Sequence, residues 1–285
     1  MPMRARDFAG RHALVTGAAS GIGRAVAQRL AREGAVLHLT DLRADDLRSV
    51  RARIEESGGT VATAYAADIS SIDEVRELAA AVHAETPAVD AVLNVAGIAV
   101  WGTVERMSHE QWRSVVGVNL MGPIHVIESF VPAMIEHERR GHLVNVSSAA
   151  GLVGLPWHAA YSASKFGVRG VSEVLRFDLA RHGIAVTLVT PGAVATPLVR
   201  SIQVAGIDTT TPEFERLRGH FQRRAVTPEQ AADSIVDGML RRRYLVHTSR
   251  DIAFLHALQR HLPPVYALVM DLANRAVSRL ERRLP

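Results

Sequence analysis

The sequence predicts an α/β fold in which helices cover both faces of one parallel β-sheet. Short apolar stretches of strand length alternate with longer stretches of helical periodicity, which is the pattern of repeated βαβ units. The apolar stretches lack the alternation of a half-exposed strand, so we expect strands that are buried on both faces. The composition agrees, because 48% of the residues are hydrophobic but only 5% are aromatic. Right-handed crossovers bring the carboxyl ends of the strands to one edge of the sheet, where ligands bind.

The first strand, residues 11–16, is followed by a glycine-rich turn and a helix over residues 24–32. Glycines in such a turn let the backbone approach a pyrophosphate, and the free N–H groups at the start of the helix face its charge. This context predicts a dinucleotide-binding turn. Its candidate residues are Gly17, Ser20, Gly21, Ile22 and Gly23.

The second strand, residues 35–40, ends at Asp41, which follows Gly21 by 20 residues. A carboxylate at this distance accepts hydrogen bonds from the ribose hydroxyls and repels a 2′-phosphate, so Asp41 favours NAD over NADP. Arg24 and Arg43 are nearby cations that suit a 2′-phosphate, and NADP therefore stays the alternative. A turn or helix-capping role for Asp41 is also open.

A helix over residues 45–57 leads to a third strand at 61–66, and a helix over residues 72–84 leads to a fourth strand at 90–93. Asp68 follows the third strand, where it is placed to accept a hydrogen bond from an adenine amino group or to cap the next helix. The other candidate cofactor residues at these two strand ends are Ile69, Asn94, Ala96 and Gly97.

The second half continues with a long helix from Gln111 onward that carries Asn119, a polar residue that needs partners in an apolar stretch. The strand at 142–146 ends in Ser147 and Ser148, whose side chains point to opposite faces, so at most one of them serves a given site. A further strand at 184–190 runs into a Pro-Gly turn.

Tyr161 and Lys165 lie one turn apart in a segment of helical periodicity, so their side chains share a face. Lys165 is the only lysine, although Lys and Arg together number 33. Arginine does not replace lysine where a compact ammonium is needed. A nearby ammonium lowers the pKa of a tyrosine, so we expect Tyr161 to be a proton donor and acceptor.

Composition limits the function classes. The chain has no cysteine, which excludes thiolate metal sites, and no His/Asp/Glu spacing suggests a metal. The net charge of +4 is uneven, with +6 in residues 241–285 and −2 before them, so the body does not have the charge of a nucleic-acid binder. The start lacks a signal-like apolar run and no apolar run is long enough to span a bilayer, so we expect a cytoplasmic protein.

With these motifs, the chain resembles the short-chain dehydrogenase/reductase family over residues 8–250. The resemblance implies a single-domain Rossmann fold with a seven-stranded parallel sheet, and hydride transfer between a nicotinamide and an alcohol or carbonyl. It also implies a homodimer or homotetramer. It rests on Thr16-Gly17-x-x-x-Gly21-x-Gly23, Asn94-x-Ala96-Gly97, Asn119, Ser148, Tyr161-x-x-x-Lys165 and Pro191-Gly192-x-x-x-Thr196.

The resemblance also implies a role for each catalytic residue. Ser148 holds the substrate oxygen while Ser147 faces away, and Tyr161 passes the proton. Lys165 lowers the Tyr161 pKa and binds the nicotinamide ribose, and Asn119 holds a water that connects Lys165 to solvent. The implied carboxamide and pyrophosphate contacts come from Pro191, Gly192, Val194 and Thr196. Val95 replaces the second Asn of the family motif, with little expected loss because those contacts are main-chain.

An apolar substrate is expected from the residues near this site. They indicate a bulky secondary alcohol or ketone of sterol, retinoid or long-chain type, covered by a lid at 197–224. The expected wall is formed by Val100, Trp101, Leu152, Val153, Leu155, Trp157, His158, Leu198, Val199, Ile202 and Val204.

Residues 251–285 follow this domain as a helical extension with apolar residues at helical spacing, flanked by Arg241–Arg243 and by Arg279, Arg282 and Arg283. Basic amphipathic helices bind anionic membranes, and they also pack on their own protein or on a second subunit. Both interpretations are open.

Two other functions compete with NAD-dependent alcohol or ketone chemistry. One is an NADPH-dependent 3-oxoacyl-thioester reductase on the same fold, against which Asp41 argues. The other is a dinucleotide-sensing protein without turnover, against which the complete set of Asn119, Ser148, Tyr161 and Lys165 argues.

Overall fold

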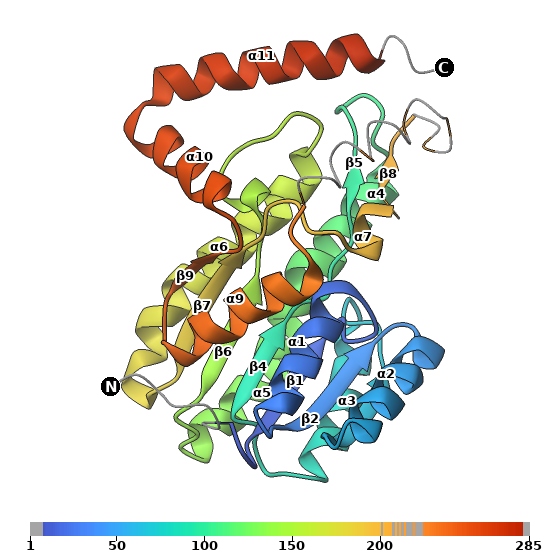
Figure 1. Ribbon diagram of the computed structural model, residues 1–285, viewed down its shortest axis with the longest axis vertical. Coiled ribbons are helices and arrows are strands. Elements are labelled where there is room, and N and C mark those ends of the chain that lie inside the picture. Colours follow the sequence, from blue (N-terminus) through green and yellow to red (C-terminus); the bar gives the residue numbers. More distant parts are fainter. Residues whose placement is uncertain are drawn as a thin grey trace.

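A computed structural model describes residues 8–200, 202–206, 209, 211, 214, 219 and 225–281. Its main sheet has seven parallel strands in the order β3-β2-β1-β4-β6-β7-β9, which confirms the predicted fold class (Figure 1). The strands are β1 (His12–Thr16), β2 (Val36–Asp41), β3 (Thr60–Ala66), β4 (Ala91–Asn94), β6 (His142–Val146), β7 (Ala185–Thr190) and β9 (Leu245–His247).

Two hydrophobic layers fix the helices to this sheet. Side chains of α1 (Gly21–Arg32), α2 (Ala44–Glu56) and α9 (Pro228–Leu240) fill one layer, with Leu30 and Ile235 fully buried. The opposite layer contains α3 (Ile72–His83) and α5 (Gly122–Glu136), with Phe130 and Met134 fully buried, and Leu175 of α6 (Ala159–Asp178) packs against it. Both faces of the sheet are therefore covered, as the apolar strand sequences require.

The predicted helix from Gln111 begins earlier, at His109, because Ser108 and Gln111 form a capping box. It is interrupted after α4 (His109–Val116) by a π-helical turn at Gly117–Met121, and α5 follows. Among the described helices, the stretch 109–136 is long and apolar enough to cross a membrane. Val115, Val126 and Phe130 of this stretch are fully buried within the fold, so we assign it to the core.

A second, two-stranded parallel sheet joins the segments on the substrate side. Strand β5 (Val100–Trp101) pairs with β8 (Gln203–Val204), and α7 (Pro197–Arg200) precedes β8. α7 and β8 form the first part of the expected lid. Most of its remainder, residues 207–224, lies outside the described residues.

The last two helices, α10 (Arg250–His261) and α11 (Pro263–Glu281), confirm the predicted helical extension and are here called the C-terminal arm. In Figure 1, α11 crosses the end of the molecule beyond the carboxyl ends of the strands. Its Val265, Leu268, Val269 and Leu272 are exposed. Arg241–Arg243 do not flank the arm as expected. They follow α9 at the opposite end of the sheet, where Arg242 donates to the carbonyl oxygens of Gly183 and Arg140.

Two buried histidines predict acid sensitivity of the fold. Burial is the main cause that lowers the pKa of His38 to about 4, helped by the charges of His12 and His83. The His38 ring lies 2.9 Å from His12 Nδ1 and 3.0 Å from Thr63 Oγ1. Burial also lowers the pKa of His142 to about 4. The folded state thus binds fewer protons than the unfolded state, in which histidine has a pKa of about 6.5.

Stability is therefore full above about pH 6.5 and is lost as the pH falls towards 4. We expect the free energy of unfolding to fall by about 2 kcal/mol per buried histidine between pH 7 and pH 5. Denaturant titrations at several pH values measure this slope. His38→Gln should flatten it, while His137→Gln, on an exposed turn, should leave it unchanged. An unchanged slope in His38→Gln would rule His38 out as the cause.

Candidate active site

Ser148, Tyr161 and Lys165 meet at the carboxyl edge of the sheet. Ser148 is the second residue after β6, and the other two side chains lie one turn apart on α6. The Ser148 side chain lies beside the Tyr161 phenol, where it acts to lower the pKa of that phenol. Lys165 Nζ lies 5.8 Å from the centroid of the Tyr161 ring and donates to Val146 O at 3.1 Å. Ser147 Oγ instead donates to Lys165 O at 2.8 Å, so it faces away, as expected.

The electrostatics of this cluster differ from the expectation. Burial raises the pKa of Tyr161, and the neighbouring Ser148 side chain only opposes that rise. Burial also lowers the pKa of Lys165 to about 8. The expected lowering of the Tyr161 pKa by Lys165 is not found in this arrangement, because desolvation of the phenol sets the direction of the shift.

Asn119 is fully buried in the π-helical turn beside this cluster. Its Oδ1 accepts from Ile98 N at 2.8 Å, and its Nδ2 donates to Ile98 O at 2.9 Å. The side chain therefore fixes the segment after β4 to the catalytic helices. A water-relay role for Asn119 stays a prediction.

The glycine-rich turn has the geometry that a dinucleotide phosphate requires. Gly17 and Gly21 have φ angles of +66° and +51°, a region that favours glycine. A Cβ on Gly23 would collide with the carbonyl oxygen of Gly17. Helix α1 starts at Gly21, its N-cap Ser20 makes no side-chain capping bond, and its first turn has no acidic residue. Ile22 packs against the core below, so the residues present fit a pyrophosphate above the helix start.

Two candidate cofactor carboxylates at neighbouring strand ends make structural hydrogen bonds. Asp41 Oδ2 accepts from Ala19 N in the glycine-rich turn at 3.1 Å, and its Oδ1 accepts from Arg43 N at 3.1 Å. This side chain is only 10% exposed, beside the turn. Asp68 Oδ1 accepts from Ser70 N at 2.9 Å, so Asp68 stabilises the turn before α3, and Ser71 supplies the N-cap. Ile69, which lies between Asp68 and Ser70 in the chain, is buried.

The end of β4 is locked to the end of β1. Thr16 Oγ1 accepts from Val95 N at 3.0 Å and from Ala96 N at 3.1 Å, so Val95 contributes its main chain. A Cβ on Gly17 would lie 2.8 Å from Ala96 Cα. A Cβ on Gly97 would lie 3.0 Å from Asn119 Oδ1 and 3.5 Å from Lys165 Nζ. The phosphate and catalytic ends of the site are thus contiguous.

Asn145 is a structural residue that the sequence reasoning missed. Its Oδ1 accepts from Asn94 Nδ2 at 2.9 Å, and its Nδ2 donates to Ser172 Oγ at 3.0 Å. Asn94 Oδ1 is buried and has no hydrogen-bond partner among the described residues. The signal was a polar residue within the otherwise apolar β6, which required partners.

The segment after β7 returns over the glycine-rich turn. Pro191 O accepts from Ala149 N at 2.8 Å, which ties this segment to the residue after Ser148. Val194 pairs with Val226 in an isolated bridge. Thr196 Cγ2 lies 3.1 Å from where a Cβ of Gly21 would be. The structure therefore brings the candidate cofactor residues Gly21, Gly192, Val194 and Thr196 to one edge.

The expected substrate wall separates into two groups. Tyr161 packs with one group, which lies in or against the buried clusters around Ala99 and Val115. Leu152, Val153 and Leu155 instead pack against the C-terminal arm. The residues of the first group are Val100, Trp101, Trp157, Leu198, Val199, Ile202 and Val204.

The rings of Trp101 and His158 connect this wall to the Tyr161 ring. The His158 ring lies 4.3 Å from the Trp101 ring and 6.1 Å from the Tyr161 ring, between centroids. His158 Nδ1 lies 2.6 Å from Pro156 O, and burial lowers the pKa of His158, so this ring is neutral near pH 7. Trp157 has a φ of +65°, an unfavourable value for a bulky residue that places it at this site.

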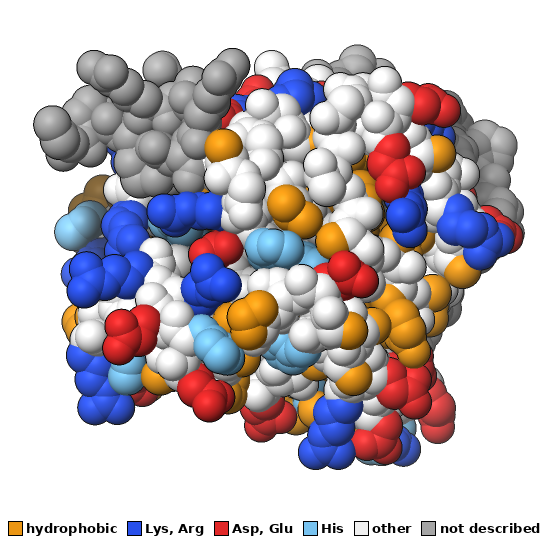
Figure 2. All heavy atoms as spheres, turned by 90° about the horizontal axis from the view of Figure 1, so that it is seen from below, with side chains coloured by type: hydrophobic (Ala, Val, Ile, Leu, Met, Phe, Trp, Pro, Cys, Tyr) orange, Lys and Arg blue, Asp and Glu red, His pale blue; other side chains and the backbone are white. Residues whose placement is uncertain are grey.

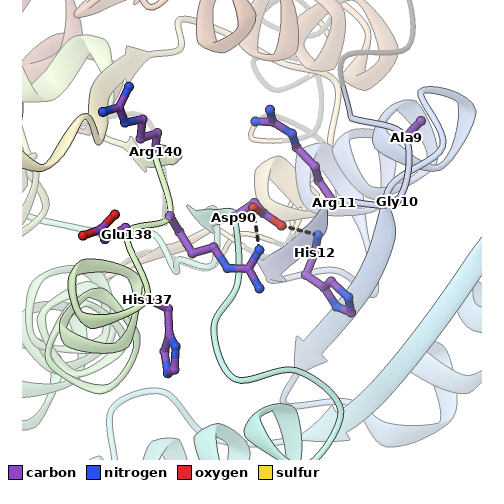
Figure 3. Close-up of a pocket in the computed structure, with 9 residues that line it drawn as sticks. Ala9, Gly10, Arg11, His12, Asp90, His137, Glu138 and Arg140 are labelled. Atoms are coloured by element: carbon purple, nitrogen blue, oxygen red, sulfur yellow. Dashed lines mark hydrogen bonds and ion pairs between the residues drawn. The ribbon is translucent and has the colours of Figure 1, made fainter.

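Two surface hollows lie at the other end of the sheet. One, of about 510 Å³, is lined by residues 9–12, 90 and 137–140 (Figure 3). In it, Asp90 accepts from His12 N at 2.9 Å and pairs with Arg139 at 3.7 Å. The second is lined by residues around Arg140, His182 and Arg242. Figure 2, which views the molecule from the end away from the C-terminal arm, shows charges of both signs interspersed. Neither hollow is lined by Ser148, Tyr161 or Lys165.

Comparisons with known proteins find relatives in sequence and in fold. The 3-oxoacyl-acyl-carrier-protein reductase FabG of Thermotoga maritima is 36% identical over 227 residues, which cover 80% of this chain and 89% of that protein. A short-chain dehydrogenase/reductase of Burkholderia phymatum, solved in complex with NAD, has a TM-score of 0.83 and 27% identity, and the match covers 92% of this chain and 96% of that one. A metagenomic short-chain oxidoreductase in complex with NADP has a TM-score of 0.67 and 30% identity, and the match covers 84% and 96%.

The short chain dehydrogenase family model matches residues 11–205, from β1 through the catalytic helix to the start of the expected lid. This span contains the glycine-rich turn, Asn119, Ser148, Tyr161 and Lys165, which the structure assembles at one edge. The chain therefore belongs to the short-chain dehydrogenase/reductase family and is an oxidoreductase.

Proposed function

We propose that the protein is an NAD(H)-dependent oxidoreductase that interconverts bulky apolar secondary alcohols and ketones. The observation that carries the proposal is the contact of Tyr161 with an apolar wall on one side, while the Ser148 side chain lies beside its phenol. Trp101, Trp157 and Leu198 pack against the same cluster as Tyr161. A site of this kind favours a substrate whose surroundings at the reacting carbon are large and apolar.

The residues divide the chemistry as follows. A nicotinamide dinucleotide supplies the hydride chemistry when it is bound. Ser148 holds the substrate oxygen by a hydrogen bond beside the phenol. Because burial raises the pKa of Tyr161, the phenol is protonated near pH 7 and donates its proton to the oxygen of a ketone. In alcohol oxidation the same phenol oxygen takes the proton back. Lys165 binds the ribose hydroxyls through its buried ammonium.

A panel of ketones assayed with NADH and with NADPH tests this proposal. We expect decalin-type, sterol-type and long-chain ketones to have kcat/KM values at least about tenfold above those of small polar ketones, because each buried methylene adds roughly 0.8 kcal/mol. Equal values for both classes would contradict the apolar-substrate assignment.

Asp41 should determine the cofactor preference. Asp41→Asn keeps an oxygen for the bond from Ala19 N but removes the charge that repels a 2′-phosphate. We expect the NADPH-to-NADH ratio of kcat/KM to rise at least about tenfold, since one unfavourable charge contact costs on the order of 1.4 kcal/mol. Asp45→Asn, an exposed carboxylate on the next helix, is the matched control. An unchanged ratio in Asp41→Asn would show that other residues select the cofactor.

The similarity to FabG favours a second candidate, an NADPH-dependent 3-oxoacyl-thioester reductase. This candidate predicts turnover of a 3-oxoacyl thioester with NADPH, which the same assay detects. The two proposals differ at Asp41, whose carboxylate beside the glycine-rich turn supports NAD. Self-association, which the family resemblance implies, is supported by the exposed Phe166, Val174 and Phe177 on α6.

A further inference from the structure

The C-terminal arm is seated on the loop that connects the catalytic serine to the catalytic helix. Leu152 and Val153, each 1% exposed, form a buried cluster with Ile252 of α10. Leu255 and Tyr266 of the arm pack against the same cluster. The only regular structure in this loop, residues 149–155, is one 3₁₀ turn at Ala149–Gly151. The position of the loop therefore depends on the side chains that pack against it.

One directional bond fixes the contact. The Tyr266 hydroxyl donates to Gly154 O at 3.1 Å, and the two residues are 112 positions apart in the chain. Apolar contacts hold the loop against the arm but do not fix its orientation, because they are non-directional. The hydrogen bond from Tyr266 is directional, so it fixes the position of the Gly154 carbonyl group. Residues 263–281, which carry Tyr266, lie beyond the span that the family model matches.

The other side of the same turn touches the catalytic groups. A Cβ on Gly151 would collide with Ser147 Oγ and would lie 2.7 Å from Lys165 O. Ala149 N donates to Pro191 O at 2.8 Å, and Ser148 is the N-cap of the turn, with its Oγ accepting from Ala150 N at 3.1 Å. The turn is thus held between the arm on one side and the backbone of Lys165 on the other.

The arm also touches the cofactor side of the site. A Cβ on Gly192 would lie 2.9 Å from Ile252 Cγ1 and 3.0 Å from Ser249 Oγ. The start of the arm therefore packs directly on the Pro-Gly turn after β7. The arm thus contacts both the 149–155 loop and the turn after β7.

We propose that Tyr266 is a positioning residue for substrate binding: its bond to Gly154 O holds the 149–155 loop so that Ser148 and the apolar wall meet the substrate in one geometry. The inference rests on the proposed function for the identity of the substrate, but not for the mechanical role of the bond. Tyr266 acts through the loop and is not itself a catalytic residue.

The test compares the full-length protein with Tyr266→Phe, which removes only the hydroxyl and keeps the ring in its cluster. We expect KM for the ketone to rise about three- to tenfold, as the loss of one hydrogen bond implies, with kcat and NADH affinity within twofold of wild type. We also expect faster amide hydrogen–deuterium exchange in residues 149–155. Tyr65→Phe, which removes a phenol bond to Glu77 on the surface, should change neither quantity.

Exchange separates this inference from the proposed function. If no ketone of the panel is turned over, the proposed function fails, while exchange in the 149–155 loop still decides whether Tyr266 holds it. Unchanged exchange in Tyr266→Phe would overturn the inference. An unchanged KM, or a loss of kcat together with a lowered melting temperature, would overturn it as well, because the first removes the link to substrate and the second indicates a general structural role.

Discussion

Tyr161→Phe is expected to lower kcat by about a thousandfold while NADH affinity stays within about twofold of wild type. The substitution removes the only group of the cluster that is placed to give a proton to the substrate oxygen, and such proton transfer contributes typically 10²–10⁴-fold. The ring itself stays in its apolar surroundings, where it packs between two buried clusters. Single-turnover reduction followed at 340 nm measures the rate, and quenching of NADH fluorescence measures binding.

The matched control for this prediction is Tyr244→Phe, which removes a hydroxyl that has no hydrogen-bond partner among the described residues. It should keep the wild-type rate. A loss of NADH binding together with turnover in Tyr161→Phe would mean that Tyr161 serves the cofactor and not the proton. A wild-type rate in Tyr161→Phe would place the acid elsewhere.

Lys165→Arg is expected to lower kcat/KM by about a hundredfold or more, although it keeps a positive charge. Lys165 is 4% exposed, and its Nζ fits between Val146 O and the position of Gly97. A planar guanidinium needs more room and presents its donors in a fixed fork, so it does not replace a compact ammonium there. Initial rates at saturating NADH, with folding checked by circular dichroism, measure the effect.

The reverse change one turn further on the same helix is the control. Arg169→Lys replaces a partly exposed residue that pairs with Glu173 at 3.9 Å, and it should keep the wild-type rate. Wild-type activity of Lys165→Arg would contradict the argument that this position requires a lysine.

The sequence predicted the sheet and the catalytic helix because both depend on local patterns. Apolar strands alternating with helices required a parallel sheet, and the spacing of Tyr161 and Lys165 placed their side chains together. The pKa of Tyr161 could not be predicted in the same way. Spacing shows which charge is near the phenol, but desolvation depends on side chains from β5, α7 and β8, which only the fold brings around it.

Long-range packing also explains the other differences. Leu152 and Val153 looked like substrate wall from their place after Ser148, but their partner is Ile252, about 100 positions later in the chain. The arginines at 241–243 are close to the arm in sequence, but the edge strand β9 lies between them and the arm and runs away from them. The π-helical turn at Asn119 has no sequence signature beyond one buried polar residue.

The strand order also determines when parts of the sheet can form during synthesis of the chain. Strand β9 pairs with β7 only after the ribosome has reached residue 247, and the arm that packs on the loop behind Ser148 is made later still. At typical translation rates of about 5–20 residues per second, the last helices follow β9 by seconds. A nascent chain therefore exposes its glycine-rich turn before it exposes the arm that packs on the loop behind Ser148.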